Sequence, residues 1–194
     1  MLPVLNGLCG DCTEERSWFS FTKSKDTSQH GLKVLMPLMY CCLHLLHDTD
    51  GVLSRGAYKA LSTLIVVASE KQESNISWQR IIETSLMACI RTGFKTHNLA
   101  VRRSFVLLLS VVSKTFAPVN SPNLSSDLFV LVRDDEPELD FFLNITHVQI
   151  HRRSRALARL RKFLSGFDGM EECTISTQSL TTVLLPLALH PVYE

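Results

Sequence analysis

The chain has 194 residues, of which 45% are hydrophobic and 20% are charged, and its formal net charge at pH 7 is +1. This composition can form a packed core and excludes a wholly disordered protein, while the small net charge means that any nucleic-acid contact must come from a local basic patch. With only 8 glycines and 7 prolines, the chain favours helices over a β-sandwich or a β-barrel.

The predicted helices follow an irregular N-terminal segment. Residues 1–30 show no clear period, whereas from residue 31 onward apolar side chains recur at helical spacing. The first predicted helix holds Leu32 to Leu46 and is broken by the turn-forming sequence from Asp48 to Gly51. Three further helices are expected over 57–68, over 81–93 with Ser77 as N-cap, and over 101–116, where Pro118 ends the helix. A helical segment then runs from Asn123 to the acidic turn at 134–137, and a short helix with Pro137 in its first turn follows. The last two predicted helices cover roughly 145–165 and a segment through Leu187 that has Ser176 as N-cap.

The predicted helical hairpins repeat at a regular interval. They begin near residues 31, 77 and 123, which are 46 residues apart, and HEAT and armadillo repeats are ~40–47 residues long. No stretch alternates with a period of two, so strands are not expected. The prediction is an all-α fold, a HEAT/armadillo-like helical-hairpin solenoid over residues 31–194 whose antiparallel pairs stack in sequence order. Residues 185–194 are still typical of a core, which favours an internal fragment of a longer array.

Six cysteines raise the alternatives of disulfides and of a zinc site. Cys9 and Cys12 form a CxxC and His44 and His47 form an HxxH, but the loop between the pairs is too long for zinc and the histidines fall in a core-like helix. The first residues do not resemble a signal peptide, and no apolar run approaches the ~20 residues that span a bilayer. We therefore expect an intracellular protein with reduced thiols, no metal and no membrane segment.

Motifs of catalytic sites are not found in the sequence. It contains no GxSxG nucleophile elbow, glycine-rich phosphate loop, HExxH zinc motif or EF-hand loop. The carboxylates between Asp134 and Asp140 could hold a hard cation, but acids at the start of a helix are more simply caps and ion-pair partners. The expectation is a protein that is not an enzyme and has neither a cofactor nor a small-molecule substrate.

The stretch from His147 to Lys162 is the most unusual part of the chain, because it contains six Arg or Lys residues and no acid. On a helix its residues separate into two faces. The predicted buried face holds Ile145, Ala156, Leu160, Phe163, Leu164 and Phe167, and the opposite stripe holds His147, His151, Arg155, Arg159 and Lys162. The stripe fits either a solvated face balanced by the acidic turn or a contact surface for RNA phosphates or an acidic protein. No aromatic residue interleaves it, so base stacking is not expected.

Arg153 projects among the predicted buried positions and therefore requires acceptors for its charge. The nearest acids in the sequence are those of the preceding turn. If the long helix returns antiparallel over that turn, Asp140 or Asp135 is the expected partner. The pair would form an internal clasp that fixes the angle between two helices.

Residues 135–157, DEPELDFFLNITHVQIHRRSRAL, resemble the signature of the down-regulated-in-metastasis (DRIM) family, very large nucleolar HEAT-repeat proteins of the small-subunit processome. Leu143 departs from the polar residue expected at its position, and the resemblance covers about 23 of the 194 residues. It implies a structural role in pre-ribosome assembly and 18S rRNA processing in the nucleolus, without catalysis. The implied partners are other pre-ribosomal proteins and, through phosphate contacts, pre-rRNA or the box C/D small nucleolar RNA.

Two hypotheses for the function follow. The first is a scaffold of the small-subunit processome, as the resemblance implies. The second is a generic helical-repeat adaptor that binds proteins elsewhere in the cell and is unrelated to ribosome assembly. Association with pre-ribosomal particles would separate them.

Overall fold

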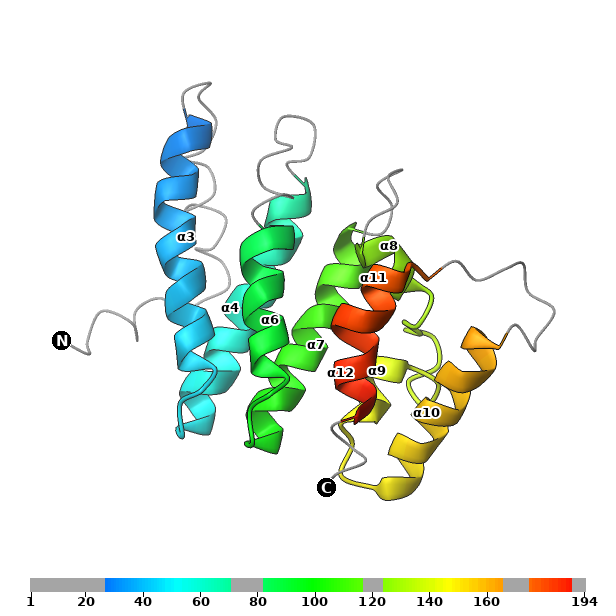
Figure 1. Ribbon diagram of the computed structural model, residues 1–194. Helices are drawn as coiled ribbons and strands as arrows, with labels where there is room; N and C mark the ends of the chain where they lie inside the picture. The colour runs from blue at the N-terminus through cyan, green and yellow to red at the C-terminus, as the bar shows by residue number, and fades with distance from the viewer. Residues whose placement is uncertain (1–26, 71–81, 117–123, 166–174, 190–194) are drawn as a thin grey trace. The chain divides into compact units, whose positions relative to one another are not determined.

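The computed structural model describes residues 27–70, 82–116, 124–165 and 175–189 (Figure 1). The regular structure of these residues is helical, with no strand among them, which confirms the predicted all-α class. Contacts divide the chain into two compact units, residues 1–61 and residues 62–194. None of the described helices is both long enough and apolar enough to cross a membrane.

The first unit contains α3 (Thr27–Leu45) and the start of α4 (Gly51–Glu70). The turn between them is closed by carboxylates, because Asp48 accepts a hydrogen bond from the backbone N–H of Asp50 (2.9 Å) and Asp50 accepts one from that of Val52 (2.7 Å). Short side-chain acceptors of this kind cap the exposed N–H groups at the start of a helix. The predicted break between Asp48 and Gly51 is therefore confirmed.

The beginning of α3 differs from the prediction. The helix starts at Thr27, four residues before the start predicted near residue 31. Apolar spacing reports only the buried face of a helix, and the polar first turn from Thr27 to His30 carries no such signal. Residues 1–26, with Cys9 and Cys12, lie outside the described residues.

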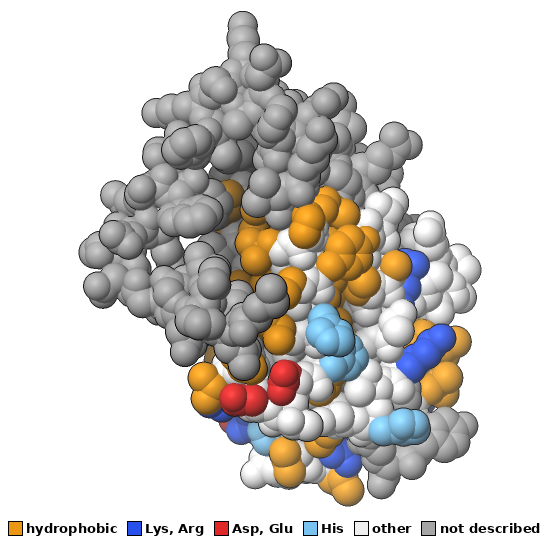
Figure 2. Space-filling view, turned by 90° about the vertical axis from the view of Figure 1, so that its left-hand side faces the viewer, with side chains coloured by type: hydrophobic (Ala, Val, Ile, Leu, Met, Phe, Trp, Pro, Cys, Tyr) orange, Lys and Arg blue, Asp and Glu red, His pale blue; other side chains and the backbone are white. Residues whose placement is uncertain are grey.

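Apolar side chains of α3 lie on more than one side of the helix. Met39, Cys42 and Leu43 are buried, whereas Leu38 and Tyr40 are 37% and 47% exposed. Figure 2 shows apolar and histidine side chains together on the face seen from the left of Figure 1. Leu38 and Tyr40, two residues apart, are thus exposed apolar side chains on different sides of the helix.

The second unit is built around α7 (Leu99–Phe116). All the apolar residues that the helical spacing predicted on its buried face are buried, namely Val101, Phe105, Leu108, Leu109, Val112 and Phe116, and Arg102, Val106, Ser110 and Ser113 are buried as well. The π-helical turn η2 (Ile82–Leu86) and α6 (Met87–Gly93) precede it, and α6 packs against α7. The predicted N-cap Ser77 and the predicted hairpin starts at 77 and 123 lie outside the described residues.

The remaining helices of this unit are shorter than α7. They are α8 (Leu124–Phe129), α9 (Phe141–Ile145), α10 (Ile150–Leu164), α11 (Thr177–Ser179), η3 (Leu180–Leu184) and α12 (Leu185–Leu189). Both α8 and α9 contact α7, α11 contacts α8, and α10 contacts α9. The long helix predicted over roughly 145–165 is α10, but it begins five residues later than predicted, at Ile150, because α9 ends at Ile145 and the chain breaks between them.

A carboxylate joins α8 to α11 across 49 residues of sequence. Asp127 accepts hydrogen bonds from the backbone N–H of Ser176 (3.1 Å), the Ser176 hydroxyl (2.6 Å) and the buried Ser179 hydroxyl (2.6 Å). Ser176 also accepts a hydrogen bond from the backbone N–H of Ser179, which confirms it as the predicted N-cap. A helix with a single turn is marginal alone, so this contact holds α11 in place.

Gly93 allows the end of α6 to approach α7 closely. A Cβ atom at this position would lie 2.3 Å from the Phe105 ring, far inside van der Waals contact. Phe105 and the adjacent Phe94 are 2% and 0% exposed, so the ring has little room to move. The sequence predicts Gly93 only as the end of a helix, whereas the structure shows that it is also a packing site.

Gly93→Ala is expected to lower the free energy of unfolding by about 1–3 kcal/mol, because the added methyl group overpacks a filled core. Urea denaturation followed by circular dichroism measures the change. Gly56→Ala in α4 is the matched control, since a Cβ there meets nothing within 4 Å, and alanine should leave stability unchanged or raise it by up to ~1 kcal/mol. Equal losses for the two variants would contradict the close approach.

Candidate interaction surface

The turn before α9 is organised by the carboxylate of Asp140, which is 1% exposed. It accepts a hydrogen bond from the backbone N–H of Leu143 (2.7 Å) as the N-cap of α9 and another from the backbone N–H of Arg133 (3.0 Å). Pro137 lies in the turn before this cap, where the N–H of Leu139 binds the carbonyl of Glu136 (2.8 Å). The prediction that Pro137 begins a helix is therefore wrong.

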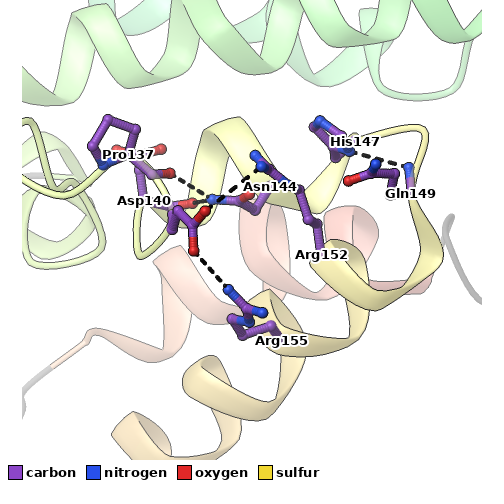
Figure 3. A network of polar contacts seen from close by, with 8 residues as sticks. Pro137, Asp140, Asn144, His147, Gln149, Arg152 and Arg155 are labelled. Atoms are coloured by element: carbon purple, nitrogen blue, oxygen red, sulfur yellow. Dashed lines mark hydrogen bonds and ion pairs between the residues drawn. The ribbon is translucent and has the colours of Figure 1, made fainter.

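Asn144 closes the same turn from inside. Its side-chain amide, buried with the residue 2% exposed, donates hydrogen bonds to the carbonyl oxygens of Pro137 (2.8 Å) and Asp140 (2.6 Å) (Figure 3). The backbone N–H of Phe141 adds a hydrogen bond to the carbonyl of Leu131 (3.2 Å). Because buried polar groups are costly without partners, these bonds specify one conformation for the turn.

The break between α9 and α10 is stabilised by side chains. His147 Nδ1 accepts a hydrogen bond from the backbone N–H of Gln149 (3.1 Å), as Figure 3 shows. The guanidinium of Arg153 donates to the carbonyl oxygens of His147 (3.1 Å) and Val148 (3.3 Å). The break therefore has defined acceptors and donors of its own.

The predicted ion pair of Arg153 with Asp135 or Asp140 is wrong. A helical side chain leans toward the N-terminus of its helix, which brings Arg153 back to the carbonyls just before α10. The carboxylate of Asp140 is directed at backbone N–H groups, and Asp135 is exposed. The half-buried Arg153 thus satisfies backbone acceptors and is not part of a carboxylate clasp.

Other arginines of α10 make the contact with the acidic turn. Glu138 lies 3.1 Å from Arg155 and 3.7 Å from Arg152, and Arg159 donates to the carbonyl oxygen of Leu139 (Figure 3 shows Arg152 and Arg155). The return of α10 over this turn is thus confirmed, with partners different from those predicted. The side chain of Glu138 is 67% exposed, and ion pairs of this kind contribute only ~0–1 kcal/mol each.

In the structure, the residues of the predicted basic stripe differ in exposure and in their contacts. Arg155 and Arg159 are engaged with the turn at residues 138–139. His147 precedes α10 and is half-buried, whereas His151 and Lys162 are exposed. Arg161, which was not assigned to the stripe, is exposed as well.

The predicted buried face of this segment is only partly correct. Ile145, Ala156 and Leu160 are buried, but Phe163 is half-buried and Leu164 is 47% exposed. Phe167 lies outside the described residues. With only Ala156 and Leu160 buried in α10, this helix rests on a narrow apolar contact and is otherwise accessible.

A cluster of cations surrounds the α9–α10 break. Partial desolvation lowers the pKa of His147 from 6.5, and the positive charges that add to this effect belong to Arg152, Arg103, His151 and Arg153. Arg103 lies on α7, 44 residues before His147 in the sequence, and no pattern in the sequence connects the two. Among the described ion pairs, neither Arg103 nor His151 has a carboxylate partner. The junction is therefore electropositive.

The described residues contain no group of three or more His, Cys, Asp or Glu side chains arranged to hold a metal ion. Cys41, Cys42 and Cys89 are not part of a disulfide, and burial raises the pKa of Cys89, which makes that thiol less reactive. Cys9, Cys12 and Cys173 lie outside the described residues.

Asp140→Ala is expected to lower the free energy of unfolding by about 2 kcal/mol, because α9 would no longer be capped and the N–H of Arg133 would have no acceptor. Chemical denaturation of the purified chain measures the change. Asp135→Ala removes an exposed carboxylate five residues away and should change stability by no more than ~0.5 kcal/mol. Similar values for the two variants would exclude a special role for Asp140.

Arg103→Gln is expected to raise the pKa of His147, because one of the cations that oppose its protonation is removed. An NMR titration of the His147 ring protons measures this, and Arg161→Gln serves as the control. In the native chain the lowered pKa makes the unfolded state the better proton acceptor, so this histidine makes the fold less stable as the pH falls below 6.5. An unchanged His147 midpoint in Arg103→Gln would show that the two residues do not interact.

Comparison with known proteins yields two relatives, while no family model matches the chain. The chain is 27% identical over 162 residues to U3 small nucleolar RNA-associated protein 20 of Saccharomyces cerevisiae, which covers 82% of the chain and 6% of that protein. It is 28% identical over 126 residues to the protein of the same name in Schizosaccharomyces pombe, which covers 64% of the chain and 5% of the relative. The chain thus spans about a twentieth of the length of these relatives and is similar, over most of its own length, to proteins associated with U3 small nucleolar RNA.

Proposed function

We propose that the chain is a non-catalytic scaffold of the small-subunit processome, which acts in 18S rRNA processing and ribosome biogenesis in the nucleolus through protein and pre-rRNA contacts. The observation that carries the proposal is the similarity to two U3 small nucleolar RNA-associated proteins, which extends over 82% of the chain in one case. The resemblance of residues 135–157 to the DRIM family points to the same role.

The chemistry of the 135–157 region supports a scaffold in preference to an enzyme. Two of its buried polar side chains, Asp140 and Asn144, are occupied by backbone hydrogen bonds, and the hydroxyl of the third, Thr146, is buried and so not accessible to a substrate. Catalytic groups, in contrast, must present a lone pair or a proton to a substrate. The residues of the DRIM-like segment therefore hold its own turn and helices together.

A HEAT-like solenoid is the architecture proposed for this scaffold. The interval of 46 residues between predicted hairpins and the helical structure of the described residues support it. In such an array each helix buries one face against its neighbours and leaves the other available for partners. The proposed partners are other pre-ribosomal proteins.

Contact with pre-rRNA or small nucleolar RNA is proposed for the exposed cations of α10. His151, Arg161 and Lys162 are exposed, and none of them is joined to a carboxylate by the described ion pairs. Phosphate contacts of this type depend on charge and position and do not read the base sequence. A protein-binding adaptor unrelated to ribosome assembly remains the alternative function.

Cells that produce the tagged chain provide the test. The chain is expected to sediment with pre-ribosomal particles in a sucrose gradient and to recover U3 small nucleolar RNA when purified through its tag. Absence from these particles, together with stable association elsewhere, would favour the adaptor.

The triple variant His151→Glu, Arg161→Glu and Lys162→Glu is expected to weaken recovery of RNA at moderate salt. For every phosphate that the variant no longer neutralises, the slope of log affinity against log salt should fall by about 1. Arg55→Glu, Lys95→Glu and His97→Glu form the matched control, because they change exposed cations elsewhere. Equally weak recovery by both variants would indicate a general charge effect and not a contact surface.

A further inference from the structure

Two aliphatic side chains stand exposed at the break between α9 and α10. Val148 and Ile150 are 72% and 70% exposed, the highest values among the exposed large apolar residues of the described chain. Single exposed apolar residues are ordinary on protein surfaces. Two β-branched side chains separated by one residue form a small apolar projection, which we call the tip.

The backbone of the tip is held in one conformation. Arg153 binds the carbonyl oxygens of His147 and Val148, and the N–H of Gln149 binds the ring of His147. A charged side chain is thus used to fix the segment that displays the two aliphatic groups. A surface already ordered before binding loses less conformational entropy when a partner docks.

Positive charge lies near the tip on two elements. Arg152 lies on the first turn of α10, and Arg103 comes from α7. The charges that lower the pKa of His147 are those of Arg152, Arg103, His151 and Arg153. Glu138 is the carboxylate nearest to this group in the described ion pairs, and it is shared by Arg152 and Arg155. The charge around the tip therefore favours an anionic partner.

We propose that the tip, Val148 and Ile150 together with the guanidinium groups of Arg103 and Arg152, docks an acidic segment of another protein that carries an apolar anchor residue. Carboxylates would meet the cations while the anchor covers the two aliphatic side chains. A phosphate backbone satisfies the cations but offers nothing that would cover Val148 and Ile150, and the tip has no aromatic side chain on which a base could stack. The inference rests on the scaffold role proposed above, since it names the chemistry of one protein partner.

Selection from a display library of random 12-residue peptides on the immobilised full chain tests the proposal. The enriched peptides are expected to combine several Asp or Glu residues with Leu, Ile or Phe. A synthetic peptide of the enriched sequence should bind about tenfold more weakly to the double variant Val148→Ser and Ile150→Ser, because a central apolar anchor contributes much of the affinity of such contacts. Arg103→Gln should also weaken it and should reduce its salt dependence.

Val52→Ser is the matched control, because Val52 is 68% exposed at the start of α4, and it should bind the peptide as the unchanged chain does. Circular dichroism should give the melting temperature of the unchanged chain for the Val148→Ser and Ile150→Ser variant and for Val52→Ser, since these side chains are exposed.

Failure of the library to enrich peptides, enrichment of peptides without acids, or equal binding by the Val148→Ser and Ile150→Ser variant would each overturn the proposal. A 12-nucleotide single-stranded RNA that displaces the peptide and binds the double variant unchanged would overturn it in favour of an RNA surface. The selection uses the purified chain alone, so its failure is distinct from failure of the chain to enter pre-ribosomal particles.

Discussion

The buried carboxylate of Asp140 is the interaction on which the α9–α10 region depends. A carboxylate inside a protein is unfavourable unless donors replace the water that it loses, and here the N–H groups of Arg133 and Leu143 do so. One donor lies in the first turn of α9 and the other in the segment that follows α8, so a single side chain ties the two segments together. Asn144 then closes the turn by binding two carbonyl oxygens. Because α10 contacts α9, its position depends on this junction as well.

The apolar contact that holds α10 is narrow, so much of the helix is accessible. Only Ala156 and Leu160 are buried in this helix, compared with seven buried apolar residues in α7. Exposed pairs with Glu138 and a hydrogen bond to the carbonyl of Leu139 supply the remaining contacts. A helix held in this way contributes little to the core and leaves most of its surface accessible.

The residues that carry the DRIM-like pattern have two kinds of role. Asp140, Asn144 and Arg153 stabilise the local backbone, whereas Val148 and His151 are exposed and have no structural task that the contacts reveal. Similarity to the two yeast proteins at 27% and 28% identity is compatible with either role. The distinction directs experiments on binding to the exposed group, because substitutions in the first group would alter the fold.

The helical class, the buried face of α7 and the cap at Ser176 could be predicted because each depends on residues within one or two turns. The break before Ile150 could not, since the apolar spacing from Ile145 to Leu160 continues across it. That break depends on Arg153 binding carbonyls and on the carboxylate of Asp140 starting a separate helix. The charge of Arg103 on α7 lowers the pKa of His147 at the α9–α10 break. This interaction depends on how segments that are distant in the sequence pack together. Periodicity identifies which side of a helix is buried, but the partner of a polar side chain is decided by whichever donors and acceptors the packed chain places within reach.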